Sequence, residues 1–171
     1  HGLFIKTGAG TLTVDGATFS GGQTLVMDGA LAQTGGNTAI DALVLGLSIN
    51  PVTGLPSTGA LTVSGGSLAV DTSLQVGSFG ATGLVTQTGG DVRVFAGCGD
   101  IARCAALNIG NQGGTGTYDI SGGSLTFDGP GFFILGRNDG ANASTGTLNL
   151  GGPGGGAVSQ GTLVGGHNLA P

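Results

Sequence analysis

The chain has 171 residues, enough to bury the core of a single domain, and 40 of these residues are glycine. Nine acidic and four basic residues give a net charge of −5, which leaves no basic patch to neutralise phosphates and excludes a nucleic-acid partner. The uninterrupted apolar runs are far shorter than the roughly 20 residues that a membrane helix needs, so no membrane span is predicted.

A glycine-rich pattern recurs in chain order along the whole sequence, which is typical of repeat architectures. Degenerate copies begin at Gly10 and Gly146, and the clear copies read GALAQTGGNT from Gly29, GALTVSGGSL from Gly59, GLVTQTGGDV from Gly83 and GTYDISGGSL from Gly116. Each unit is roughly 24 to 33 residues long. Each unit also holds a second apolar strand that ends in glycine: LVLG from Leu43, LQVG from Leu74, LNIG from Leu107 and FILG from Phe133.

The residues between the glycine corners favour strands over helices. Thr, Val, Leu and Ile dominate, and Leu61 and Val63 alternate with Thr62 and Ser64 as a half-buried strand requires. A strand of about four residues between corners is stable only when equivalent strands stack on one another. The sequence therefore predicts one all-β domain over residues 1–171, a parallel β-solenoid, with an antiparallel sandwich as the alternative.

Stacked copies place apolar residues of successive units in ladders inside the coil. We expect one interior ladder of Leu61, Leu84, Tyr118 and Leu148. A second group lies near the following corner and comprises Val63, Thr86, Ile120 and Leu150.

Two insertions interrupt the repeat and predict surface loops near residues 48–58 and 96–105. The second contains the only cysteines, Cys98 and Cys104, in the segment CGDIARC. We expect a disulfide between them, with a free buried pair and metal or redox chemistry as the alternatives.

Both ends of the sequence resemble repeat strands and not polar caps. Leu3, Phe4 and Ile5 enter the repeat almost at once, and Leu163 and Val164 form a strand-like pair near the other end. Because an exposed parallel edge recruits another strand, we expect these residues to mediate head-to-tail association of identical chains.

The first unit, from Leu3 to Leu31, resembles the passenger-associated transport repeat of bacterial autotransporters. The residues that match that pattern in kind are Lys6, Gly8, Gly10, Leu12, Val14, Gly16, Gly21, Thr24, Gly29 and Leu31. Phe19 replaces the usual Tyr, and the segment is one residue shorter than the pattern. The resemblance implies a right-handed β-helix that is secreted or displayed on the surface of a Gram-negative bacterium, and it implies no particular activity.

No residue pattern indicates catalysis, a metal site or a bound cofactor. Asp71, Asp91, Asp119 and Asp128 follow glycine corners, but their offsets within the repeat differ, so we expect a solvated outer face. The chain has no Trp and one Tyr, which disfavours sugar binding by stacking. We expect an extracellular structural protein that polymerises into a filament or matrix fibre. A surface adhesin with a cell-surface or matrix partner is the alternative, and a polysaccharide-active enzyme is less favoured.

Overall fold

The computed structural model describes residues 2–16, 18–50, 52–95, 105–128, 132–138, 142–151 and 161–165, and for 18–21, 105–106 and 161–165 the backbone alone. These residues form strands and connections and contain no helix. The strands are β1 (Gly2–Lys6), β2 (Thr11–Asp15), β3 (Thr18–Val26), β4 (Asp28–Gly35), β5 (Asn37–Leu47), β6 (Thr58–Val63), β7 (Ser67–Ser78), β8 (Thr82–Phe95), β9 (Ala105–Asn111), β10 (Thr115–Asp128), β11 (Phe132–Arg137), β12 (Thr145–Leu150) and β13 (Gly161–Gly165).

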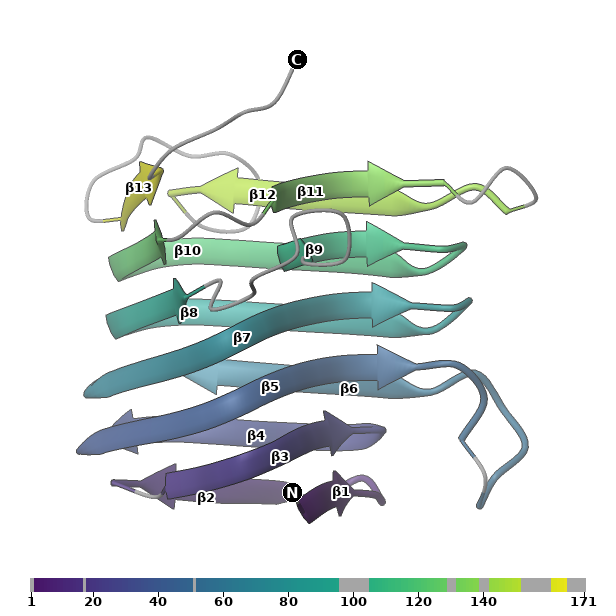
Figure 1. The fold of residues 1–171 in the computed structure, drawn as a ribbon, viewed down its shortest axis with the longest axis horizontal. Coiled ribbons are helices and arrows are strands. Elements are labelled where there is room, and N and C mark those ends of the chain that lie inside the picture. The colour runs from purple at the N-terminus through teal and green to yellow at the C-terminus, as the bar shows by residue number, and fades with distance from the viewer. Residues whose placement is uncertain are drawn as a thin grey trace.

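The chain winds into coils that stack from β1 and β2 at one end to β11, β12 and β13 at the other (Figure 1). Every pairing between the named strands is parallel. The predicted all-β parallel solenoid is therefore confirmed, and the antiparallel sandwich is excluded for the described residues.

Three faces surround the core, each a ladder of equivalent strand segments. Face 1 comprises β2, β4, β6, residues 82–87 of β8, residues 115–120 of β10, and β12. Face 2 comprises residues 18–19 of β3, 37–40 of β5, 67–70 of β7, 91–95 of β8, 124–128 of β10, and β13. Face 3 comprises β1, residues 22–26 of β3, 42–47 of β5, 73–78 of β7, β9 and β11.

The recurring glycines are required where face 3 turns into face 1. Gly77 has a φ of 73°, in the left-handed region that glycine adopts without steric cost. A Cβ atom on Gly83 would lie only 2.2 Å from the backbone nitrogen of Gly77. Backbone thus packs directly against backbone at this corner, which explains why each unit contains both an apolar strand ending in glycine and a glycine just after the next strand begins.

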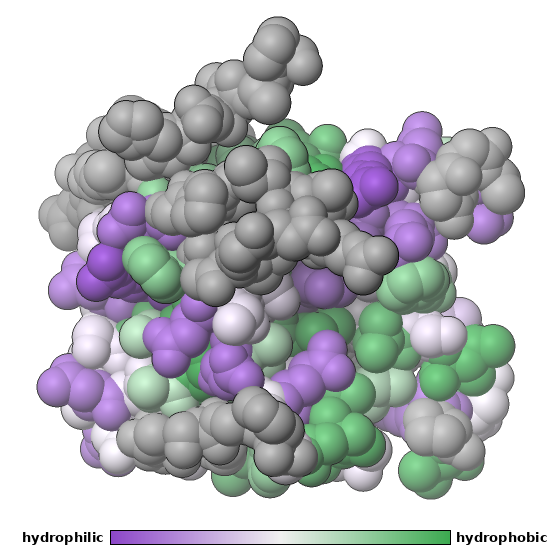
Figure 2. Space-filling model, viewed as in Figure 1, coloured by the Kyte–Doolittle hydropathy of each residue, from purple (hydrophilic) through white to green (hydrophobic). Residues whose placement is uncertain are grey.

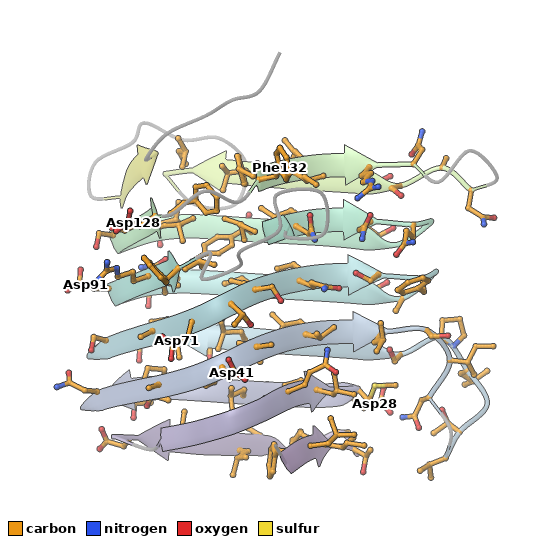
Figure 3. The ribbon with its side chains drawn as sticks, viewed as in Figure 1. Asp28, Asp41, Asp71, Asp91, Asp128 and Phe132 are labelled. Carbon is orange, nitrogen blue, oxygen red and sulfur yellow. The ribbon has the colours of Figure 1, made fainter. Side chains whose placement is uncertain are left out.

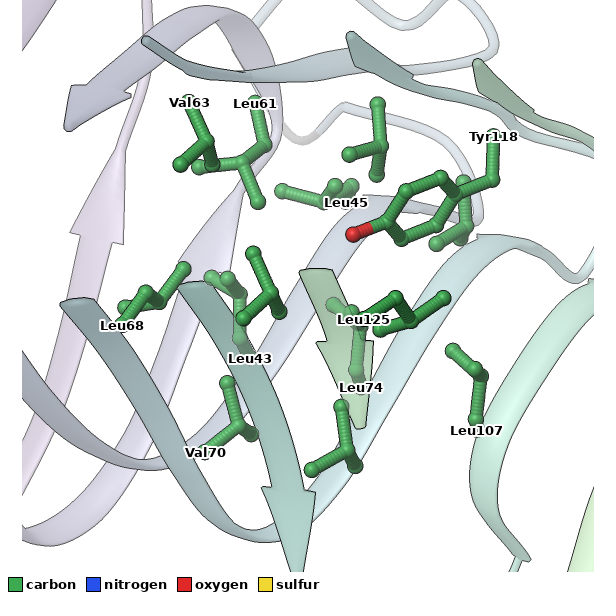
Figure 4. Close-up of a cluster of buried hydrophobic side chains, with 14 of the residues drawn as sticks. Leu43, Leu45, Leu61, Val63, Leu68, Val70, Leu74, Leu107, Tyr118 and Leu125 are labelled. Atoms are coloured by element: carbon green, nitrogen blue, oxygen red, sulfur yellow. The ribbon is translucent and has the colours of Figure 1, made fainter. Parts of the chain in front are cut away.

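The interior is a continuous apolar column to which all three faces contribute. Face 1 supplies the ladder Leu31, Leu61, Val85 and Tyr118, each completely buried. Face 2 supplies Leu68, Val92 and Leu125, and face 3 supplies Leu43, Leu74 and Leu107. Figure 4 shows side chains from the three faces converging on one another.

The expected place of Leu84 in the interior ladder is wrong. Leu84 pairs with Ala60 and remains 38% exposed, whereas the next residue, Val85, pairs with Leu61 and is buried. Similarly, Gln87 and not Thr86 lies in register with Val63. Gly83 aligns with Gly59 and fixes this register, and a shift of one residue moves a side chain to the opposite face of a strand.

Gln87 is a polar residue inside the column, and its hydrogen bonds join its own coil to the next one. The Gln87 amide nitrogen donates to the carbonyl oxygens of Gly90 at 3.1 Å and Ser124 at 2.8 Å. Its oxygen accepts a bond of 2.7 Å from the Tyr118 hydroxyl. A buried amide is tolerated here because its polar atoms have partners.

Candidate self-association surface

The coil made by β1 and β2 has one paired side. β1 pairs with β3 alone and β2 pairs with β4 alone, whereas β5, β7 and β8 have neighbours on both sides. The outer edges of β1 and β2 therefore carry backbone N–H and C=O groups without a neighbouring strand in the described part of the chain. Such an edge is a template for another parallel strand.

The three apolar side chains of β1 that the sequence predicted to mediate association are exposed. Leu3 is 58% exposed, Phe4 37% and Ile5 47%. Phe4 is in register with Thr24 and Leu43 of the interior ladder, and Ile5 is in register with Leu25 and Val44 on the outer side of face 3. A further coil stacked on this edge would extend both rows and remove their apolar surface from water.

Lys6 closes the corner of this first coil. Its ammonium group donates hydrogen bonds to the carbonyl oxygens of Gly8 at 2.6 Å, Asp28 at 2.9 Å and Thr7 at 3.4 Å. The corner carbonyls are thereby satisfied locally, and the unpaired edge is confined to the strands.

In the last described coil, β12 pairs with β10 alone among the described strands, and Leu148 and Leu150 are partly buried against the core. Leu163 and Val164 lie in β13, in register with Leu125 and Thr126 of β10. The backbone therefore places them on face 2 of the last described coil, where β13 extends the strand ladder beyond β10.

The loop between β5 and β6 exposes several apolar side chains. Ile49 is 59% exposed, Val52 77% and Leu55 65%. The buried Asn50 holds this loop: its side-chain nitrogen donates to the carboxylate of Asp28, and its side-chain oxygen accepts from the Val52 backbone nitrogen at 2.8 Å. The sequence located this loop but did not indicate how firmly it is held.

The aspartates singled out in the sequence do not share one face. Asp91 and Asp128 lie on face 2. Asp71 directly follows Val70, the last residue of β7 that is paired on face 2. Asp119 lies on face 1, where it accepts a hydrogen bond of 2.5 Å from Asn149. The described residues contain no group of three His, Cys, Asp or Glu side chains that could hold a metal ion.

Cys98 and Cys104 lie outside the described residues, so their disulfide stays a prediction, as does most of the loop near 96–105. Thiol labelling of the unreduced protein under mild denaturation tests the bond. Stoichiometric reaction of both cysteines would contradict it.

No family model matches this sequence, and comparisons with curated proteins and with solved structures give no match. No helix in the described part of the chain is long and apolar enough to cross a membrane. The fold places the chain in an architectural class, the parallel β-solenoids.

Proposed function

We propose that this chain is an extracellular structural protein whose solenoid stacks head to tail with further copies into a fibre. The observation that carries the proposal is the unpaired parallel edge of β1 and β2, with Leu3 and Ile5 exposed on it. Stacking another coil there would satisfy backbone groups and bury apolar side chains in the same step.

The first and last described coils also carry compatible rows on face 1. Leu12 of the first coil and Leu148 of the last described coil belong to the ladder that contains Leu61. Val14 and Leu150 belong in the same way to the ladder that contains Val63. Joining one end to the other continues each ladder with a similar side chain. A head-to-tail contact of this kind does not close on itself and therefore propagates.

The resemblance of the first unit to autotransporter passenger repeats supports a secreted or surface-displayed location in a Gram-negative bacterium. The scarcity of charge on the strands is compatible with a matrix or fibre role, because few like charges oppose lateral or axial contact.

The test is the association state of the chain and of an edge variant. We expect the apparent molar mass from light scattering to rise with protein concentration. Electron microscopy should show fibres one solenoid wide. Ile5→Lys should abolish growth, because a charge on the edge strand would be buried at the junction. Leu84→Lys, on the exposed outer side of β8 in the middle of the solenoid, is the matched control and should assemble normally.

A wild-type chain that stays monomeric at high concentration would overturn this function. The same would follow if Leu84→Lys blocked assembly as strongly as Ile5→Lys, because the contact would then be lateral and not coil on coil.

A further inference from the structure

A hollow lies on the outer side of face 2, away from the ends of the solenoid. It is lined by Ala69, Val70 and Asp71 of β7 and by Arg93 and Phe95 of β8, and its volume is about 280 Å³. This volume is just below the range of about 300–1,000 Å³ that is typical of small-ligand sites, so the hollow suits a single ring-sized unit.

The hollow exists because a small residue stands between larger ones on neighbouring strands. Ala69 is in register with Arg93 on one side and with Ala39 on the other. Because alanine side chains are short, the outer face is recessed at this point. The larger side chains of Arg93, Phe95 and Asp71 surround the recess. Hydrophilic side chains gather over the ends of β7, β8 and β10 at the left of Figure 2.

The Arg93 side chain makes one contact with the next coil and one along its own strand. Its guanidinium nitrogen Nη2 lies 2.8 Å from the carboxylate oxygen Oδ2 of Asp128, on the next coil. The guanidinium carbon also lies 5.6 Å from the centre of the Phe95 ring. This arrangement fixes N–H donors next to an aromatic ring that is 40% exposed.

The opposite wall supplies an acceptor. Asp71 is exposed and, within the described residues, its carboxylate accepts no hydrogen bond. The hollow thus combines a donor, an acceptor, an aromatic ring and an apolar floor within one small space. A pyranose ring has matching chemistry, because its hydroxyl groups both donate and accept while its C–H face is apolar.

The surrounding charge selects the class of saccharide. Asp41, Asp71, Asp91 and Asp128 lie on this side of the molecule (Figure 3), and Arg93 is already paired with one of them. An acidic sugar would be repelled by the remaining carboxylates. From these contacts we propose that the hollow between β7 and β8 binds a neutral hexose unit of a polysaccharide.

This site is separate from the stacking edge, so each proposal can fail without the other. The experiment is affinity electrophoresis of the whole chain through gels that contain dextran, galactomannan or hydroxyethylcellulose, with polygalacturonate as the acidic probe. We expect at least one neutral polymer to retard the wild-type chain and polygalacturonate to leave it unretarded.

Variants assign the retardation to the hollow. Phe95→Asn and Asp71→Asn should each weaken the interaction roughly tenfold, the loss typical of a central contact residue. Phe79→Asn is the matched control, because Phe79 is 50% exposed at a corner outside the hollow. Circular dichroism and thermal unfolding verify that each variant is folded.

Three outcomes would overturn the proposal. The first is that no neutral polymer retards the wild-type chain. The second is retardation by polygalacturonate alone, which would assign anion binding to Arg93. The third is an equal loss in Phe95→Asn and Phe79→Asn, which would indicate nonspecific adsorption to exposed aromatic rings.

Discussion

At the scale of single residues, Gly116 shows how closely the backbone packs at the corners. An added Cβ atom would lie 2.1 Å from the carbonyl oxygen of Val76 and 2.4 Å from the backbone nitrogen of Gly110. We expect Gly116→Ala to lower the free energy of unfolding by about 3 kcal/mol, because backbone atoms cannot move aside as a side chain can. Urea unfolding measures this loss.

Gly10→Ala is the control for this prediction. A Cβ atom on Gly10 would meet nothing within 4 Å, and Gly10 is not among the glycines with positive φ. The substitution should be neutral or raise stability by roughly 0.4–1 kcal/mol through the unfolded chain. Similar losses at both positions would show that close packing at the corners is not the cause.

Tyr118 provides a titration that reports on the core directly. Burial raises the pKa of its hydroxyl far above the ordinary value near 10, because the phenolate would lose its hydration. A raised pKa in the folded state stabilises the fold below the unfolded pKa of about 10, and this contribution is lost as the pH rises above it.

Tyr118 is the only tyrosine and the chain has no Trp, so tyrosinate absorbance reports on this residue alone. At about pH 11 the folded protein should show no tyrosinate, and it should appear only together with unfolding. Tyr118→Phe should remove this alkaline loss of stability. Ionisation near pH 10 with the fold intact would contradict the buried position.

At the scale of elements, the loop between β5 and β6 depends on Asn50. Asn50→Ala removes the bonds of the side chain to Asp28 and to the Val52 nitrogen. We expect faster protease cleavage within residues 48–57, with little change in the melting of the strands, because the loop is stabilised locally. Mass mapping of the fragments locates the cuts.

Thr53→Ala is the matched control, because its hydroxyl makes only a long bond of 3.4 Å to the Leu55 nitrogen. It should leave the cleavage rate nearly unchanged. An Asn50→Ala protein that resists cleavage like the wild type would show that the apolar loop is held by something other than this anchor.

At the scale of the whole molecule, stability should decrease from the middle coils to the first. Each coil of a solenoid contacts its neighbours alone, and β1 and β2 pair on one side only. Hydrogen exchange at low protein concentration should therefore be slowest in β5, β7, β8 and β10 and fastest in β1 and β2.

Concentration separates this gradient from the proposed stacking. If copies associate through the edge of β1, protection of residues 2–6 should rise with protein concentration while the middle strands stay unchanged. Equal protection in all coils at low concentration would mean that the solenoid opens as one cooperative unit and would contradict the gradient.

The class of fold could be predicted from the amino-acid sequence. Glycine corners at a repeating spacing, with Leu61 and Val63 alternating against Thr62 and Ser64, predicted a parallel solenoid because short strands of this kind can be buried only by stacking. The sequence did not determine that Val85 and not Leu84 faces the interior, because apolar character alone does not fix which face of a strand a residue occupies. The alignment of Gly83 with Gly59 contained that information.

The lateral neighbours of each residue in other units could not be predicted in this way. The hollow on face 2 depends on Ala69 lying next to Arg93. Arg93 in turn pairs with Asp128 on the next coil. These residues are far apart in the chain, and none of them belongs to a local motif. Their proximity follows from the inter-coil register, which the packing of glycine backbones at the corners sets and which no single repeat specifies.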